Sequence, residues 1–236
     1  MNVTVLSDKG KRASNQDVVH VGSMPSGGSL YMVVDGMGGY EHGEKAAKLV
    51  AENIQTYLST VEKIGEKDLQ KAINKANLAI RQQKKELNEK MGATVGGVIL
   101  NGNEAQCFWV GDVKIFQFQD KQLHFETTAH TLVNALMSHG SMSDAAQLTK
   151  YKHVVMRSVQ GDVALSQMDY VDLQQLTTQD LLLICSDGVH EVLDGRQISD
   201  ILTHSESIAA ALLAIERRLQ SDAGDNFSLI AIDFMG

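Results

Sequence analysis

Four aspartates stand beside strongly apolar runs of this sequence, at the points where such runs begin or end. Asp35 follows the run 31–34, Asp112 follows 108–110 and a glycine, Asp187 follows 181–185 and a serine, and Asp225 comes shortly before 227–232. Burying one carboxylate at a strand end costs free energy unless the group is paired or coordinated, and burying four together costs far more without cations. If these strand ends converge in the folded chain, they converge on metal ions.

The residue types indicate which metal. The candidate ligands are oxygen donors, with no cysteine and no pair of histidines at ligand spacing, and such a set favours Mg²⁺ or Mn²⁺ over Zn²⁺. Gly36 follows Asp35 directly, and because it has no side chain its own carbonyl can approach an ion. A single Asp-Gly pair is most often a turn at a strand end. Two such pairs after apolar runs, together with Asp112 and Asp225, favour a metal site.

An arginine near the N-terminus is suited to bind the substrate of such a site. Arg12 carries a rigid guanidinium that binds phosphate through two hydrogen bonds, and beside a carboxylate cluster it would hold an anionic substrate against the metals. On its own, an arginine here would be an ordinary surface residue. The glycine-dense segment 35–44 lacks the Lys-Ser/Thr ending of a Walker A loop, and we expect Gly43 and Glu44 to open a long helix.

The histidines offer one candidate for proton transfer. His42 is the histidine nearest the glycine-dense segment, and it is the best of them for an auxiliary proton donor. Six others show no ligand spacing, so we expect them at the surface or behind the ligands. These are His20, His124, His139, His153, His190 and His204.

Nine short runs have the composition of β-strands, and many are bounded by Gly, Asp or Asn. They are 3–6, 18–21, 29–34, 94–100, 105–110, 114–118, 170–173, 181–185 and 227–234. The fourth and fifth, joined through 101–103, are typical of an antiparallel hairpin. Apolar residues at helical spacing predict helices at 44–58, 68–87 and 205–219.

The order of these elements predicts the fold class. Strands run consecutively through hairpins and helices come in pairs, which excludes the strict strand–helix alternation of a doubly wound parallel sheet. We expect an α+β fold, a four-layer α-β-β-α sandwich of two antiparallel sheets flanked by helix pairs. The less regular span 127–159 is expected to be a flap insertion, with helices at 132–138 and 144–148.

Composition limits the class of protein. The 236 residues are 43% hydrophobic, enough to bury a core, and without repeats or composition shifts they are expected to form one domain, 1–236. A net charge of -8 leaves no basic stripe, so nucleic acid and anionic membranes are poor partners. No apolar run approaches the roughly 18 residues of a membrane span, and there is no signal-peptide apolar region, so we expect a cytoplasmic protein.

Six short motifs, taken in order, resemble those of the metal-dependent serine/threonine protein phosphatases of the type 2C class, in particular their compact bacterial branch. The resemblance covers essentially the whole chain; each motif is weak alone, but six in the family's order are a strong signal. They are Arg12 with Asn15-Gln16-Asp17, Asp35-Gly36-Met37-Gly38-Gly39 with Gly43-Glu44, Gly92-Ala93-Thr94, Gly111-Asp112, Cys185-Ser186-Asp187-Gly188 and Gly224-Asp225-Asn226.

The resemblance implies a role for each site residue. It implies two Mn²⁺ or Mg²⁺ ions, and a hydroxide that bridges them and attacks phosphoserine or phosphothreonine. Asp35 would bridge the ions, the Gly36 carbonyl would bind one of them, Asp187 and Asp225 would complete the pair, Asp112 would hold a third ion, Asp17 would act through water, and Arg12 would bind the phosphate. The implied partners are phosphorylated proteins and a cognate bacterial serine/threonine kinase, and we expect a monomer.

Three departures from the family pattern leave the four main ligand positions intact. The third-metal motif ends in Val113-Lys114 instead of Ser-Arg, Ala129 replaces an aspartate at the entrance of the flap, and Met37 replaces the histidine that animal relatives carry. With Met37 unable to donate a proton, water is expected to protonate the leaving oxygen. Two alternatives remain: a phosphatase that acts on a phosphorylated anti-sigma-factor antagonist, and a catalytically weak phosphoprotein-binding regulatory module.

Overall fold

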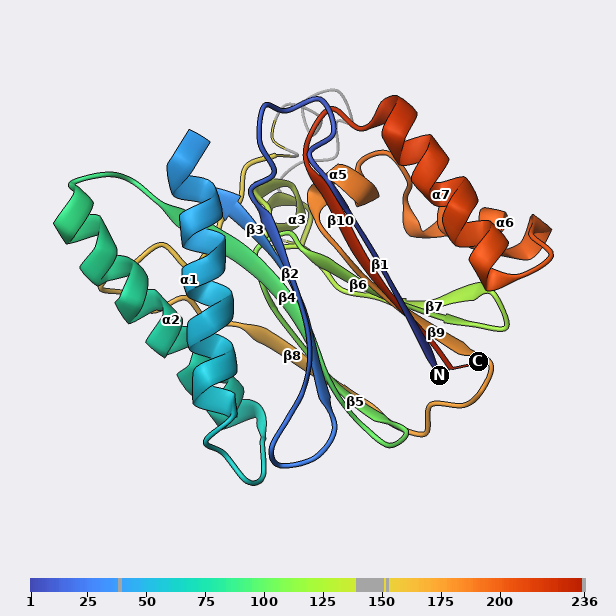
Figure 1. Ribbon diagram of the computed structural model, residues 1–236, viewed down its shortest axis with the longest axis horizontal. Coiled ribbons are helices and arrows are strands. Elements are labelled where there is room, and N and C mark those ends of the chain that lie inside the picture. Colours follow the sequence, from blue (N-terminus) through green and yellow to red (C-terminus); the bar gives the residue numbers. More distant parts are fainter. Residues whose placement is uncertain (38–39, 139–150, 152, 235–236) are drawn as a thin grey trace.

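Ten strands in the described part of the chain form two antiparallel sheets that pack face to face (Figure 1). The computed structural model describes residues 1–37, 40–138, 151 and 153–234. The first sheet has the order β1 (Asn2–Asp8), β10 (Phe227–Asp233), β9 (Asp180–Cys185), β6 (Lys114–Gln119) and β7 (Gln122–Glu126). The second has the order β2 (Asp17–Ser23), β3 (Ser29–Met37), β4 (Gly92–Asn101), β5 (Glu104–Val110) and β8 (Asp169–Leu173).

Helices cover the outer face of each sheet, which gives four layers (Figure 1). The helices α1 (Tyr40–Leu58) and α2 (Glu66–Leu87) lie against the second sheet, and α6 (Gly195–His204) and α7 (Ile208–Asp222) lie against the first. Two short helices, α3 (Leu132–Ser138) and α5 (Asp187–His190), follow β7 and β9. The predicted α+β sandwich with flanking helix pairs is confirmed. Among the described residues, no helix is long and apolar enough to cross a membrane.

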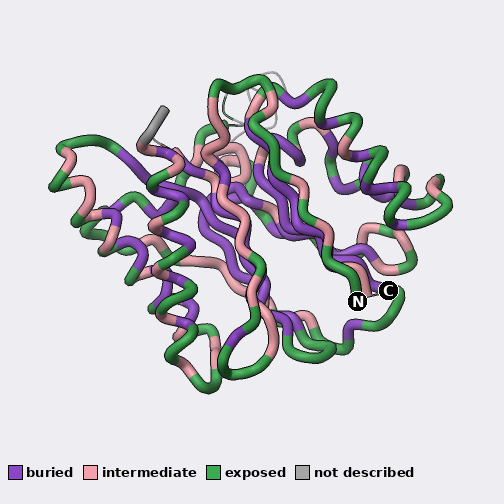
Figure 2. Tube along the Cα trace, viewed as in Figure 1, coloured by how far each residue is buried: buried purple, intermediate pink, exposed green. Residues whose placement is uncertain are grey.

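Three clusters of buried apolar side chains hold the layers together, and Figure 2 shows them as buried stretches along the strands and the inner faces of the helices. One cluster joins α1 and α2 to the second sheet and contains Ile54 and Phe108. Another joins α6 and α7 to the first sheet around Ile198. The third lies between the sheets and contains Val33 and Ile184. Because each layer boundary is packed, the strands hold their ends in fixed positions.

The structure corrects several predicted boundaries. The first long helix begins at Tyr40, so the expectation that Gly43 and Glu44 open it is wrong. The last helix begins at Ile208, because Ser207 caps it by accepting a hydrogen bond from the backbone N–H of Ala210 at 3.1 Å. The elements β7 and α6 were not predicted. The predicted helix 132–138 is α3, whereas 144–148 lies outside the described residues.

Gly97 of β4 provides a test of this packing. A Cβ added there would lie 2.6 Å from Cε1 of Phe108 and 3.0 Å from Cγ of Met32, both fully buried. We expect Gly97→Ala to lower the free energy of unfolding by about 1–3 kcal/mol, because the ring cannot move without disturbing the core. Thermal unfolding measures the change as about 2–4 °C per kcal/mol for a chain of this size.

The matched control is Gly65→Ala. Gly65 precedes α2 in extended backbone, and an added Cβ there has no atom within 4 Å. Gly65 is the N-cap of α2, where alanine is less favourable than glycine, so the loss should stay within about 1 kcal/mol. Equal melting temperatures for the two variants would contradict the packing of β4 against Phe108.

Candidate active site

The aspartates that the sequence places beside apolar runs meet at one end of the sandwich. Asp35 lies near the end of β3, and the strand register places Asp17 of β2 on one side of it and Thr94 of β4 on the other. Asp187 is the first residue of α5, directly after β9 and Ser186. In Figure 1 this end is uppermost, where the connection between β1 and β2 passes the start of β10.

Four carboxylates line a single cavity of about 460 Å³, together with Arg12 and Gly36. These carboxylates are Asp35, Asp112, Asp187 and Asp225. Asp17 is not among the lining residues; it is buried beside the cavity, where it pairs with Asp35 across β2 and β3. The structure therefore brings all the predicted site residues to one place, with Asp17 set back from the cavity surface.

Burial and mutual repulsion disfavour the charged forms of these carboxylates. The pKa of Asp35 is well above its usual range, first because of burial and then because of the charges of Asp17 and Asp187. Burial, with repulsion from Asp112, raises the pKa of Asp187 to about 8. Burial raises the pKa of Asp17 to about 6, although a hydrogen bond from Ser186 opposes the shift. Burial also raises the pKa of Asp112.

Two buried carboxylate oxygens, Oδ1 of Asp17 and Oδ1 of Asp112, have no hydrogen-bond partner among the described residues. Leaving such an atom unpaired costs about 1–3 kcal/mol or more, and a divalent cation or its bound water would satisfy it. No three His, Cys, Asp or Glu side chains of the described residues are arranged as a ready ligand set. Mg²⁺ is commonly held by one or two carboxylates and several waters, so the donors present fit such ions.

Arg12 contacts the carboxylate cluster from the connection between β1 and β2. Its Nη2 lies 2.6 Å from Oδ2 of Asp225, and the two side chains are 60% and 38% exposed. Such an exposed ion pair contributes about 0–1 kcal/mol to the free energy of unfolding, so breaking it costs little if each side chain gains another partner. The guanidinium can therefore turn to a phosphate at the cavity while Asp225 turns to a cation.

Asn226 fixes the position of the segment that carries Arg12. Its Oδ1 accepts a hydrogen bond from the backbone N–H of Gln16 at 2.9 Å, and its Nδ2 donates to the carbonyls of Lys9 at 2.9 Å and Ser14 at 2.8 Å. The side chain is buried. The sequence predicted a role for Asp225 but none for Asn226. Asn226 could have been noticed as a second polar residue directly before an apolar strand.

Ser186 holds Asp17 in place. The Ser186 hydroxyl donates to Oδ2 of Asp17 at 2.8 Å and accepts a hydrogen bond from the backbone N–H of Ser228 at 3.0 Å. Both serines are fully buried. These contacts tie the second sheet, which carries Asp17, to the first sheet at the point where Asp187 begins α5.

Close backbone contact explains the glycine that follows Asp35. A Cβ added at Gly36 would collide with the carbonyl oxygen of Gly43 and lie 2.8 Å from that of Gln16. A Cβ at Gly43 would in turn lie 2.8 Å from the Gly36 carbonyl oxygen. The two glycines thus let α1 pack directly against the strand end, with Gly36 in the cavity wall.

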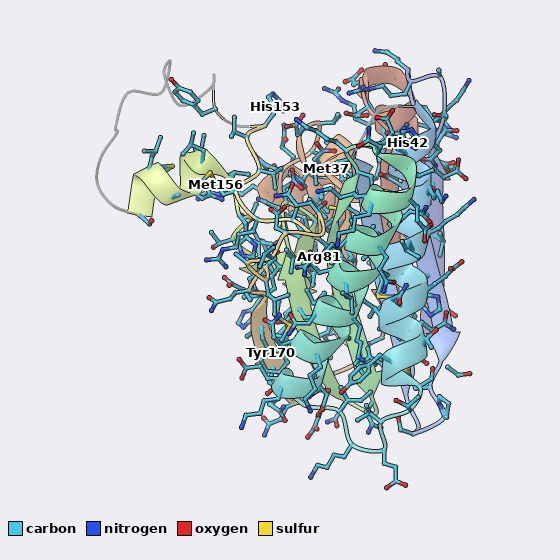
Figure 3. All side chains as sticks on the ribbon, turned by 90° about the vertical axis from the view of Figure 1, so that its left-hand side faces the viewer. Met37, His42, Arg81, His153, Met156 and Tyr170 are labelled. Atoms are coloured by element: carbon cyan, nitrogen blue, oxygen red, sulfur yellow. The ribbon has the colours of Figure 1, made fainter. Side chains whose placement is uncertain are left out.

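The histidine at the cavity is His153 and not His42. His42 belongs to α1 and is not among the lining residues, whereas Met37 and His153 are (Figure 3). His153 is 63% exposed, in agreement with the expected surface position, but no pattern in the sequence indicates that it lines the cavity with the aspartates. Its Nδ1 lies 2.7 Å from Oε1 of Glu191.

The carboxylate pKa values predict how the metal-free protein responds to pH. Because folding raises the pKa values of Asp17, Asp35 and Asp187, the folded chain binds more protons than the unfolded chain, and stability falls as the pH rises. Stability should fall over the pH range from the ordinary aspartate pKa of about 4 to about 8, the pKa of Asp187. In EDTA, the melting temperature should fall between about pH 5 and pH 8, and Mn²⁺ should raise it more at the higher pH.

Asp35→Asn separates this effect from general pH sensitivity. Removing the central charge should raise the melting temperature of the metal-free protein at high pH, by about 2–4 °C for each kcal/mol of repulsion relieved, and should flatten the pH slope. Asp200→Asn, an exposed change on α6, is the control and should leave the slope unchanged. Identical slopes for wild type and Asp35→Asn would show that the carboxylates do not repel one another.

Known proteins are similar to this chain in sequence and in fold. The family model described as Protein phosphatase 2C matches residues 7–223. Protein phosphatase PhpP of Streptococcus pneumoniae is 27% identical over 241 residues, which cover 98% of this chain and 97% of PhpP.

Two solved structures have the same fold. The S. agalactiae serine/threonine phosphatase has a TM-score of 0.89 at 22% identity, with 98% of each chain covered. The catalytic domain of PstP, a phosphatase of Mycobacterium tuberculosis, in complex with two manganese ions has a TM-score of 0.79 at 26% identity, covering 98% of this chain and 97% of that one. Since the family match extends over nearly the whole chain and the fold agrees, this chain belongs to the protein phosphatase 2C family.

Proposed function

We propose that this chain hydrolyses phosphoserine and phosphothreonine in proteins and so reverses the action of a serine/threonine kinase. The observation that carries the proposal is the cavity in which four strand-end aspartates lie with Arg12. The carboxylates suit cations, and the guanidinium suits a phosphate monoester. The names of PhpP, a protein phosphatase, and PstP, a serine/threonine protein phosphatase, support the same reaction for this chain.

The donors divide into a main pair of ion sites and a weaker third. Asp35, the Gly36 carbonyl, Asp187 and Asp225 would hold two Mn²⁺ or Mg²⁺ ions, Asp112 would hold a third, and Asp17 would contribute through water. When bound, these ions supply an activated water and neutralise charge that develops on the phosphoryl group. The PstP catalytic domain in complex with two manganese ions supports a pair.

The side chains around the cavity favour direct attack by water over a covalent enzyme intermediate. Cys185 is fully buried, and burial raises the pKa of its thiol far above the ordinary range. The buried hydroxyl of Ser186 is already hydrogen-bonded to Asp17 and to the backbone of Ser228. The residues of the chain therefore bind and orient the phosphate, and the nucleophile comes from solvent.

The same cavity favours an enzyme over a phosphoprotein-binding module. Four clustered carboxylates repel a phosphate anion, so a site that only binds phosphate would have no use for them. They are useful where they hold cations that activate water for hydrolysis. We therefore propose an enzyme that acts as a monomer on phosphorylated proteins.

Metal dependence tests the proposed function. Hydrolysis of p-nitrophenyl phosphate and of a phosphothreonine peptide should disappear in EDTA and return with Mn²⁺. Asp35→Asn and Asp187→Asn should each lower kcat by at least about 10²-fold while the chain stays folded, because each removes an ion ligand. Asp200→Asn again serves as the control. Full turnover after exhaustive chelation would overturn the proposal.

Arg12 provides a separate test of phosphate binding. Arg12→Ala should raise KM by about tenfold or more with a smaller loss in kcat, because a charged hydrogen bond made in both ground and transition states contributes uniform binding. Arg217→Ala, an exposed change on α7, is the matched control and should leave both constants unaltered. An unchanged KM for Arg12→Ala would mean that the guanidinium serves only its ion pair with Asp225.

A further inference from the structure

The leaving group of the proposed reaction needs a proton, and a side chain at the cavity can supply it in place of the water that the sequence led us to expect. A serine or threonine alkoxide is a poor leaving group unless its oxygen is protonated as the P–O bond breaks. Met37, at the position where animal relatives carry histidine, cannot donate one. The carboxylates and Arg12 are assigned to ions and phosphate. Among the described side chains that line the cavity, His153 remains as a group with the chemistry of a general acid.

The backbone around His153 is anchored to the strand end that carries Asp112. Val154 accepts a hydrogen bond from the backbone N–H of Leu132 at 2.8 Å, and Val155 forms a β-bridge with Thr131. His130, which precedes Thr131, donates from its backbone N–H to the carbonyl of Gly111, next to Asp112, at 2.8 Å. The two residues that follow His153 are therefore anchored by backbone pairing, and His153 itself lines the cavity with a largely exposed side chain.

Glu191 orients the imidazole ring. Oε1 of Glu191 lies 2.7 Å from Nδ1 of His153, and the glutamate side chain is 30% exposed. The backbone N–H of Glu191 donates to the carbonyl of Asp187 at 2.9 Å, so the glutamate rests on the helix that carries an ion ligand. Among the described residues, no hydrogen bond engages Nε2 of His153. A carboxylate at Nδ1 accepts the proton there and stabilises the protonated imidazolium ring, whose Nε2–H is then left to donate to substrate.

We propose that His153 is the general acid of this phosphatase and that Glu191 is its positioning residue, an assignment that rests on the proposed function. The oxygen of the attacking water forms a bond to phosphorus as the ester P–O bond breaks. The departing serine or threonine oxygen takes the proton from Nε2 of His153, and the ring regains a proton released by the attacking water. His153 lines the same cavity as Asp112 and the other aspartates.

The other histidines near this end are less suited to the role. His42 lies in α1 and does not line the cavity. His190 has its Nε2 2.9 Å from the carbonyl oxygen of Asp112 and is therefore already engaged. Figure 3 shows Met37, His42 and His153 at the same end of the molecule.

The decisive experiment compares two substrates that differ in their need for a proton. With full-length protein and Mn²⁺, kcat and KM are measured for a phosphothreonine peptide and for p-nitrophenyl phosphate, whose 4-nitrophenolate leaves without protonation. His153→Gln should lower kcat on the peptide by about 10²–10⁴-fold, with KM changed little, and lower kcat on p-nitrophenyl phosphate less than about threefold. His42→Gln is the control and should leave both substrates unaffected.

The outcomes distinguish the two proposals. Equal losses of kcat on both substrates, or no loss on the peptide, would overturn the assignment of His153 while the phosphatase function stands. A wild-type protein inactive on both substrates would overturn the proposed function itself. Because His153 is largely exposed, an unchanged melting temperature verifies that His153→Gln is folded.

A second pair of variants tests Glu191. Glu191→Gln should lower kcat on the peptide by a smaller factor of about 10, and Glu191→Asp should restore part of it, because a shorter carboxylate can still reach the ring. Turnover of p-nitrophenyl phosphate should not follow this order. Equal kcat values for Glu191→Gln, Glu191→Asp and wild type on the peptide would overturn the positioning role.

Discussion

Five carboxylates lie at one end of the sandwich, and loss of water together with mutual repulsion raises the pKa of four of them. This arrangement opposes folding, so the rest of the structure must offset it. The three apolar clusters do so by packing every layer boundary along the strands. The charged end is thus a strained site supported by an ordinary core, and the divalent cations of the proposed function would relieve that strain.

Placing the carboxylates this close requires backbone contacts that side chains would prevent. Gly36 lets the end of β3 touch α1 at Gly43, and a Cβ at Gly188 would collide with the carbonyl oxygen of Asn226. The side chain of Asn226 then forms hydrogen bonds with three backbone groups of the connection between β1 and β2. Glycine removes the steric barrier and the side-chain amide of Asn226 supplies hydrogen bonds to the backbone, so both are needed to bring these segments together.

The parts of the fold that were predictable are those with strong local signals. The apolar strands and the two long helices follow from periodicity, and the strand-end aspartates follow from the cost of burial. β7 was missed because its hairpin turns through Asp120 and Lys121, both with positive φ and neither a glycine. α6 was missed although Asp194 and Gln197 form a capping box that is visible in the sequence. The recessed place of Asp17 depends on strand register, which no local pattern reveals.

The proposed ion ligands lie at strand ends, whereas the proposed proton donor lies on an irregular segment. This difference explains which site residues could be found from the sequence. Ion ligands must keep fixed separations, so they come from strand ends, where apolar runs point to them. A proton donor needs only to come within hydrogen-bond reach of the leaving oxygen, so it can lie on an irregular segment. His153 lies on such a segment at the cavity, and its contact with Glu191 joins two distant parts of the chain. Local sequence carries no trace of such a contact, since an exposed histidine and an exposed glutamate look ordinary until the fold brings them together.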